Sequence, residues 1–348
     1  WRNDIFTEGI ELMYEDFFGL SRRPFTMSAD PQFLYLTPQH REAATGLIYS
    51  ILKHKGMVTV TGDPGTGKTT VLKAVLSSIS GAAIKVAYVS VPTMTAAEFL
   101  EFMLLQFGLA NLARANKAER LVMFERFLLN MYQKNRTVVL VVDEAHKLSD
   151  EILEEIRLLT NFETGQGKLV QVVLAGQPEL DEVLRRGEMS QLKQRVAYRF
   201  SLKGLTEDEV GGYIAHRWSR AGGRTAPPFD DEATRQIALY SQGIPRLINA
   251  ICDNALVMAY GDGSTEVRGV TILEAARDLD LAGQDATPDL AQESGQPDLK
   301  DLELLVAASA LADSRTSPAV ERQAPAHKES WLVRSARKLL ATNVASAD

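Results

Sequence analysis

Four short runs of apolar residues, rich in Val, Leu and Ile, lie between residues 57 and 175. They span Met57–Thr61, Ile84–Val91, Thr137–Val142 and Leu169–Ala175. Runs that carry so few polar residues predict strands of a parallel sheet, because helices cover both faces of such a sheet. Segments with helical spacing separate the runs. The alternation predicts a doubly wound α/β domain that ends near Leu202.

The helices between these strands carry start signals. Thr37-Pro38 combines an N-cap with a proline in the first turn, and predicts a helix to about Lys53. Thr95 and Glu98 form a capping box, which predicts a helix that continues through Phe107. The other helices of this domain are expected at 67–79, 119–134 and 149–162.

The pattern changes after residue 203, where only helical spacing remains. A second capping box, Thr206 with Glu209, opens a series of helices expected at 206–221, 230–241, 244–261 and 269–281. We therefore expect an α/β domain over 38–203, followed by a small all-helical domain over 204–282.

Both ends of the chain differ in composition from these domains. Residues 1–37 are expected to form an extension, with Met13 as the natural start, and an aromatic lead-in that packs over the core. Gln, Pro, Asp, Ser and Ala dominate 283–329, which predicts a disordered linker. Residues 330–348 form a short basic amphipathic tail. We expect a frayed end there, with docking on a membrane surface or a partner groove as the alternatives.

The net charge and the cysteine content limit the partners and the cellular compartment that we expect for this chain. The 348 residues carry a formal net charge of −7, so no global attraction to nucleic acid is expected, although a local basic face would remain compatible. Cys252 is the only cysteine, which excludes a disulfide within the chain and fits a reducing compartment. No run approaches the roughly 18 apolar residues of a membrane span. We expect a cytoplasmic protein, at most peripheral to a membrane.

The first strand leads into a glycine-rich loop, Gly62-Asp63-Pro64-Gly65-Thr66-Gly67-Lys68-Thr69-Thr70. It contains a complete G-x-x-x-x-G-K-[ST] phosphate loop between a strand and a helix. Backbone N–H groups of such a loop cradle nucleotide phosphates. Lys68 reaches the β and γ oxygens, and the hydroxyl of Thr69 can hold Mg²⁺.

The third strand ends in two acids, Asp143 and Glu144. The carboxyl edge of a parallel sheet places Asp143 beside the phosphate loop, where it can hold Mg²⁺ directly or through water. Glu144, one residue further, can orient and deprotonate an attacking water, which favours hydrolysis over binding alone. The alternative is that the two acids only cap the next helix. His146 either couples nucleotide state to its neighbours or is a plain structural histidine.

Four further residues are candidates for sensing or stabilising phosphate. Gln177 at the tip of the fourth strand could bond the γ-phosphate or the water, unless it is only a turn residue. Arg195 or Arg199 could stabilise the transferring phosphoryl group from a neighbouring subunit, and solvated surface arginines are the alternative. Arg246, after Gly243-Ile244-Pro245, could report on the γ-phosphate or be an exposed residue of a capped helix.

Together these motifs resemble those of AAA+ ATPases. Residues 13–20, 24–25, 35–37, 40–43, Gly176–Leu180 and Gly243–Arg246 resemble more narrowly the ExeA/GspA branch, which is similar to transposition ATPases of the TnsC and MuB type. The resemblance covers residues 13 to about 282. It implies a sheet in the order 5-1-4-3-2, ATP and Mg²⁺ as ligands, and oligomers with nucleotide between subunits. ExeA-type proteins continue into a membrane span and a peptidoglycan-binding domain. We expect neither in this chain, whose linker and basic tail suggest a shorter, cytosolic relative.

Two functions follow from this resemblance. The first is an ATPase whose nucleotide-dependent assembly into a ring or filament drives or licenses a protein partner, such as a secretion or envelope system. The alternative is an ATP-gated DNA-binding regulator of the transposition target-selection type, with Arg185, Arg186, Lys193 and Arg195 as a basic stripe. Phe25, Tyr35 and His40, which precede the first strand, could help to form a purine pocket.

Overall fold

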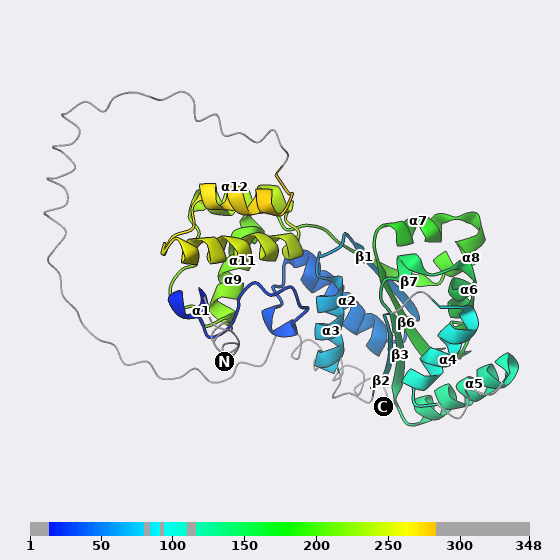
Figure 1. Cartoon of the computed structure of the whole chain (residues 1–348). Helices are drawn as coiled ribbons and strands as arrows, with labels where there is room; N and C mark the ends of the chain where they lie inside the picture. Colours follow the sequence, from blue (N-terminus) through cyan, green and yellow to red (C-terminus); the bar gives the residue numbers. More distant parts are fainter. Residues whose placement is uncertain (1–13, 80–83, 91–93, 110–115, 283–348) are drawn as a thin grey trace, which may run out of the picture. The chain divides into compact units, whose positions relative to one another are not determined.

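The structure, a computed structural model, describes residues 14–79, 84–90, 94–109 and 116–282. The expectations for residues 1–13, for the linker at 283–329 and for the tail at 330–348 lie outside these residues. Figure 1 shows the arrangement of the helices and strands.

A parallel five-stranded sheet forms the centre of the α/β region. Its strands are β1 (Met57–Gly62), β2 (Ile84–Val89), β3 (Thr137–Val142), β6 (Val170–Gly176) and β7 (Val196–Leu202). They lie in the order β2-β3-β6-β1-β7. Numbered one to five along the chain, this is the order 5-1-4-3-2 that the resemblance implies, so the predicted fold class is confirmed. A two-residue hairpin, β4 (Glu163–Thr164) with β5 (Gly167–Lys168), was not predicted.

Alternate residues of the central strands enter two separate apolar clusters, one on each face of the sheet. Val138, Leu140 and Val142 of β3 face one cluster, whereas Val139 and Val141 face the other. The second face is covered by α2 (Pro38–Leu52) and α3 (Lys68–Ile79) (Figure 1). The first is covered by α4 (Ala96–Gln106), α5 (Lys117–Gln133), α6 (Asp150–Leu159), α7 (Glu179–Arg185) and α8 (Ser190–Lys193).

The predicted helix starts follow from capping. The hydroxyl of Thr37 accepts the N–H of His40 at the start of α2, and complete capping boxes stand at Thr95 and at Thr206. A further capping box, Asn116 with Glu119, starts α5 two residues earlier than predicted.

Four helices follow the sheet: α9 (Glu207–Arg220), α10 (Asp231–Ser241), α11 (Pro245–Gly261) and α12 (Gly269–Asp278). Their shared apolar cluster includes lead-in residues, among them Tyr14 in α1 (Tyr14–Phe17) and Phe33 in the short helix η1 (Pro31–Phe33). The lead-in was expected to pack over the core. Its aromatics instead complete the core of the helical region. Among the described lead-in residues, 14–37, only Leu34 and Leu36 pack against the sheet's α2–α3 cluster.

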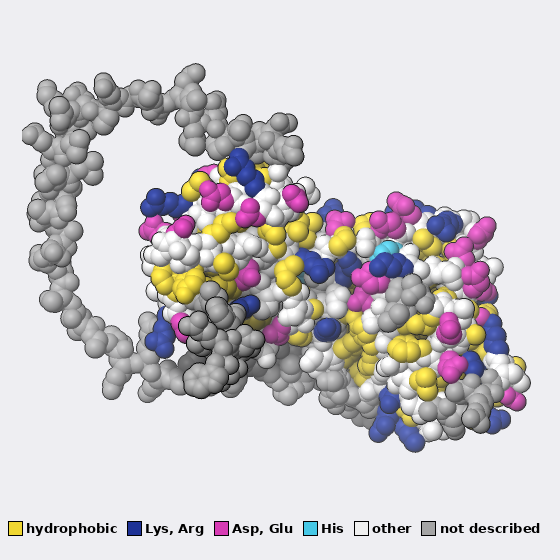
Figure 2. All heavy atoms as spheres, viewed as in Figure 1, with side chains coloured by type: hydrophobic (Ala, Val, Ile, Leu, Met, Phe, Trp, Pro, Cys, Tyr) yellow, Lys and Arg dark blue, Asp and Glu magenta, His cyan; other side chains and the backbone are white. Residues whose placement is uncertain are grey.

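None of the helices in the described part of the chain combines the length and apolar character needed to cross a membrane. On the face seen in Figure 2, basic and acidic side chains are interspersed.

Candidate nucleotide site

The glycine-rich loop occupies the turn from β1 into α3 and lines a cavity of 290 Å³. Gly65 and Gly67 adopt positive φ angles of 85° and 98°, which glycine takes without strain. A Cβ at Gly65 would also lie 2.6 Å from Cβ of Arg246. Residues 64–70 line the cavity, whereas Gly62 and Asp63 do not. The loop therefore curls closely around the space in which phosphates would lie.

Lys68 is buried beneath this loop. Its Nζ donates to the carbonyl oxygens of Gly62 and Asp63 at 2.6 and 2.9 Å. Burial lowers the pKa of Lys68, although the nearby acids Glu144 and Asp143 act to raise it. A positively charged donor is thus held at the floor of the loop, where an anion can reach it.

The carboxylate of Asp143 is held by three donors. Thr69 Oγ1 and the hydroxyl of Tyr88 both donate to Oδ2, at 2.8 and 2.7 Å, and the backbone N–H of Glu144 donates to Oδ1 at 3.0 Å. Burial and the bond to Asp143 raise the pKa of Tyr88, so the phenol keeps its proton and acts as the donor. The sequence analysis missed Tyr88. A lone hydroxyl near the end of the strand adjacent to β3 was the available signal.

Glu144 follows in a left-handed backbone conformation, with φ 56° and ψ 32°, which few residues other than glycine adopt. Its carboxylate lines the cavity and lies 3.7 Å from Nε2 of His146. Nδ1 of the same ring accepts the backbone N–H of Gln177 at 3.2 Å, so the neutral ring carries its proton on Nε2, toward Glu144. His146 thus links the acid after β3 to the tip of β6.

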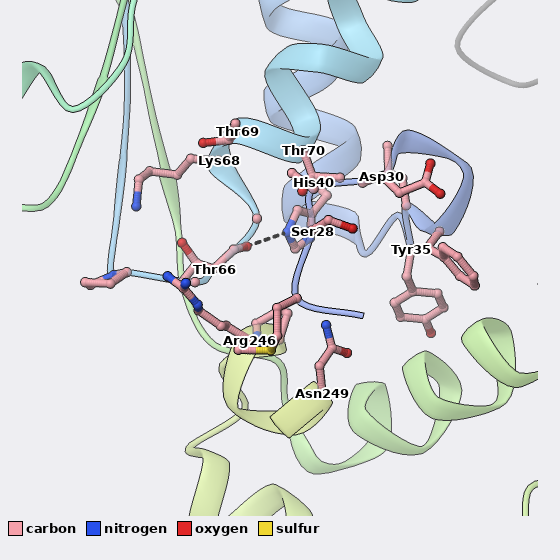
Figure 3. Close-up of a pocket in the computed structure, with 18 of the residues that line it drawn as sticks. Ser28, Asp30, Tyr35, His40, Thr66, Lys68, Thr69, Thr70, Arg246 and Asn249 are labelled. Atoms are coloured by element: carbon pink, nitrogen blue, oxygen red, sulfur yellow. Dashed lines mark hydrogen bonds between the residues drawn. The ribbon is translucent and has the colours of Figure 1, made fainter. Parts of the chain in front are cut away.

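The helical region supplies a further wall of the cavity. Gly243 has φ 70°, and Pro245 occupies the first turn of α11. The backbone N–H of Arg246 donates to the carbonyl of Gly65 at 3.3 Å, so this helix begins beside the loop. Figure 3 shows Arg246 and Asn249 on this helix, across the cavity from Lys68 and Thr69.

The lead-in forms another part of the cavity lining. Ser28, Asp30 and Tyr35 line the cavity. Figure 3 shows Ser28 close to Thr66 of the loop, with Asp30 and Tyr35 farther from it. His40 also lines the cavity and bonds the carbonyl of Thr66 through Nε2 at 3.2 Å. Burial lowers the pKa of His40, with the Thr66 carbonyl acting against this shift. Phe25 does not line the cavity, because it packs against Phe229 inside the helical region.

The two arginine-finger candidates lie elsewhere and do not line this cavity. Arg195 donates to the hydroxyl of Thr160 at 3.0 Å, and Arg199 on β7 lies 4.0 Å from Asp181. The structure therefore brings together the loop, both acids, Gln177 and Arg246, and leaves Arg195 and Arg199 outside.

This donor set suits a magnesium-bound nucleotide. The loop and Lys68 would hold the phosphates, and the oxygens of Thr69 and Asp143 are hard ligands of the kind that Mg²⁺ prefers. Mg²⁺ in nucleotide sites takes one or two protein ligands and completes its shell with phosphate oxygens and water. The residues present fit both groups.

Sequence comparison places this site in a known family. Residues 51–184 match the family described as AAA domain. General secretion pathway protein A of Aeromonas hydrophila is 40% identical over 256 residues, which are 73% of this chain and 46% of that protein. The chain therefore spans about half the length of this relative.

Solved structures share the fold. Cdc6p from Pyrobaculum aerophilum is 17% identical, with a TM-score of 0.57 over 71% of this chain and 70% of its own. The Aeropyrum pernix ORC2 protein, solved as ADPNP-ADP complexes, is 18% identical, with a TM-score of 0.53 over 71% of each chain. At such identities the likeness shows the fold alone.

Proposed function

The chain belongs to the AAA domain family, as a relative of general secretion pathway protein A, and from this membership we propose that it binds and hydrolyses ATP with Mg²⁺. One observation carries the proposal: a single cavity is lined by the phosphate loop, Glu144, Gln177 and Arg246. The loop proposed to hold the phosphates, the acid proposed to activate water and two candidate γ-phosphate contacts therefore lie around one space.

Each residue has a defined part in this proposal. The loop N–H groups and Lys68 bind the phosphates, and Thr69 and Asp143 hold the metal. Mg²⁺, when bound, offsets the negative charge of the phosphates. Glu144 orients and deprotonates the water, with its carboxylate held beside His146. Gln177 and Arg246, which both line the cavity, are the proposed contacts to the γ-phosphate.

We further propose that the chain acts as a homo-oligomer. Arg195 and Arg199 lie outside the cavity of their own chain. A guanidinium that stabilises phosphoryl transfer can be supplied by a neighbouring subunit, so one of these two residues would complete the site of the next chain. ATP would then favour assembly, and hydrolysis would reverse it.

The use of this cycle is proposed from the matched relative. Its name places it in a general secretion pathway, and we propose that nucleotide-dependent assembly of this chain drives or licenses a protein partner of such a system. The DNA-binding alternative would use the basic stripe around Arg185 and Arg186. Asp150 lies 3.6 Å from Arg186, so part of that charge is paired. A salt-sensitive affinity for duplex DNA that depends on ATP would favour the alternative.

The test of hydrolysis is Glu144→Gln. We expect the variant to bind ATP with an affinity within about twofold of wild type and to lose at least about a hundredfold in turnover, because the general base is removed. Glu182→Gln, an exposed acid on α7 that does not line the cavity, is the matched control and should hydrolyse ATP normally. An unchanged hydrolysis rate in Glu144→Gln would refute the assignment.

A further inference from the structure

A buried arginine that the sequence analysis did not single out lines the nucleotide cavity. Arg217 lies on α9, on the same face as Val210, Tyr213 and Ile214, and only 5% of its surface is exposed. Among the described residues it forms no ion pair with a carboxylate. A buried charge without a counter-ion is costly unless hydrogen bonds satisfy it, so its partners matter.

Those partners all belong to the lead-in or to the helical region. Nε donates to the carbonyl of Pro24 at 2.5 Å, and Nη2 lies 3.4 Å from both the carbonyl and the hydroxyl of Thr26. Nη1 donates to the hydroxyl of Tyr213 at 3.1 Å. The guanidinium also lies 4.5 Å from the ring centroid of Phe33. The fork of Arg217 thus holds the lead-in at two nearby residues, Pro24 and Thr26.

The hydrogen bonds form a closed ring. The hydroxyl of Tyr213 donates to Oδ1 of Asn249 at 2.9 Å, and Nδ2 of Asn249 donates to the carbonyl of Thr26 at 3.1 Å. Thr26, Arg217, Tyr213 and Asn249 therefore fix one another, and the last three line the cavity. Satisfied buried networks of this kind hold a single geometry.

Further bonds fasten the rest of the lead-in to the same helix. The N–H and hydroxyl of Ser21 both donate to the carbonyl of Ala221, Arg22 donates to the carbonyl of Arg220, and Arg220 donates to the carbonyl of Gln32. The lead-in is therefore attached along the C-terminal half of α9. Met27, Ser28, Ala29 and Asp30 lie between these attachments and line the cavity. Figure 3 shows Ser28 and Asp30 apart from Lys68 and from Thr69, the residue that bonds Asp143.

We propose that Arg217 is a positioning residue for the nucleoside half of the ligand: it fixes residues 27–30 on the helical region as the wall against which the base and ribose bind. This rests on the proposed function, because it assumes that the phosphates occupy the loop. Binding of the phosphates then depends on the loop. Binding of the nucleoside depends on the closed ring of hydrogen bonds that includes Arg217. The two halves of the site become separable by substitution.

The experiment measures displacement of a fluorescent adenine nucleotide by ATP and by inorganic tripolyphosphate, both with Mg²⁺. In Arg217→Lys the charge remains and the fork is lost. We expect the affinity for ATP to fall about tenfold, the loss of one charge-assisted hydrogen bond, and the affinity for tripolyphosphate to stay within about twofold. Arg235→Lys is the control: this exposed arginine of α10 pairs with Glu232, does not line the cavity, and should change neither affinity.

A second variant keeps the test decisive if Arg217→Lys folds poorly. Tyr213→Phe retains the ring and removes only the hydroxyl between Arg217 and Asn249, and we expect the same selective loss of ATP affinity. An unchanged ratio of ATP to tripolyphosphate affinity in the folded variants would overturn the inference and leave the proposed function standing. Wild-type protein that binds neither compound would overturn both.

Discussion

At the carboxyl edge of the sheet, a single carboxylate receives hydrogen bonds from three different elements. Thr69 reaches Asp143 from α3, Tyr88 from β2, and the backbone of Glu144 from the turn after β3. Each donor restricts the rotation of the carboxylate. The phenol of Tyr88 is the one that neither the loop motif nor the acidic strand motif includes.

Tyr88→Phe should therefore change the metal requirement of the ATPase. Loss of the phenol frees the carboxylate, at a cost typical of one hydrogen bond, about 0.5–1.5 kcal/mol. We expect the Mg²⁺ concentration for half-maximal hydrolysis to rise about three- to tenfold, with a smaller change in rate at saturating Mg²⁺. A Mg²⁺ titration of ATP turnover measures both.

The control for this titration is Tyr49→Phe, since Tyr49 lies on α2, packs edge-on against Tyr198 and does not line the cavity. It should reproduce the wild-type curve. A Tyr88→Phe curve identical to wild type would show that Asp143 needs no help from β2.

At the scale of elements, the start of α11 depends on one glycine. Gly243 has φ 70°, and a Cβ there would lie 2.0 Å from the carbonyl oxygen and 2.6 Å from the nitrogen of Leu205. The N–H of Leu205 also donates to the carbonyl of Gly243 at 2.7 Å. Two backbone segments meet here with no space for a side chain, at the entry to the helix that carries Arg246.

Gly243→Ala should destabilise the protein by about 2–4 kcal/mol, because it combines a left-handed backbone penalty with a backbone clash. Gly211→Ala in the interior of α9 is the opposite case. Its Cβ would make only a normal 3.6 Å contact with Thr234, so we expect a gain of about 0.5–1 kcal/mol. The midpoints of thermal unfolding should move in opposite directions. Equal midpoints would contradict the packing described here.

The elements were predicted from local signals wherever such signals exist. N-caps and capping boxes at Thr37, Thr95 and Thr206 set helix starts, and the fully buried strands appear as runs with few polar residues. β7 was not among those runs, because an edge strand leaves residues such as Tyr198 exposed and carries Arg199. Its presence was implied only by the family resemblance.

The residues of the site likewise divide into those that a local motif predicts and those that it does not. Loop and acid residues are close in sequence to the strands that place them, so motif spacing predicts them. Tyr88 and Arg217 act through contacts between residues 55 and about 190 positions apart, which spacing does not reveal. For Arg217, the one local sign was the position of an arginine on the apolar face of α9.

At the scale of the whole molecule, two backbone segments join the α/β region to the helical region and its lead-in. They are residues 35–37 and 203–206, and the side chain of Gln39 connects them through paired hydrogen bonds with the backbone of Lys203, at 3.0 and 3.1 Å. The cavity takes walls from both regions. Nucleotide in the cavity would therefore contact both regions at once, which would let its γ-phosphate bias their arrangement.

The most direct measurement follows ATP and phosphate in one sample of wild-type protein with Mg²⁺, concentrated enough to self-associate. The account predicts about one nucleotide retained per chain and continuous release of inorganic phosphate. Protein that retains no nucleotide and releases no phosphate under these conditions would contradict it.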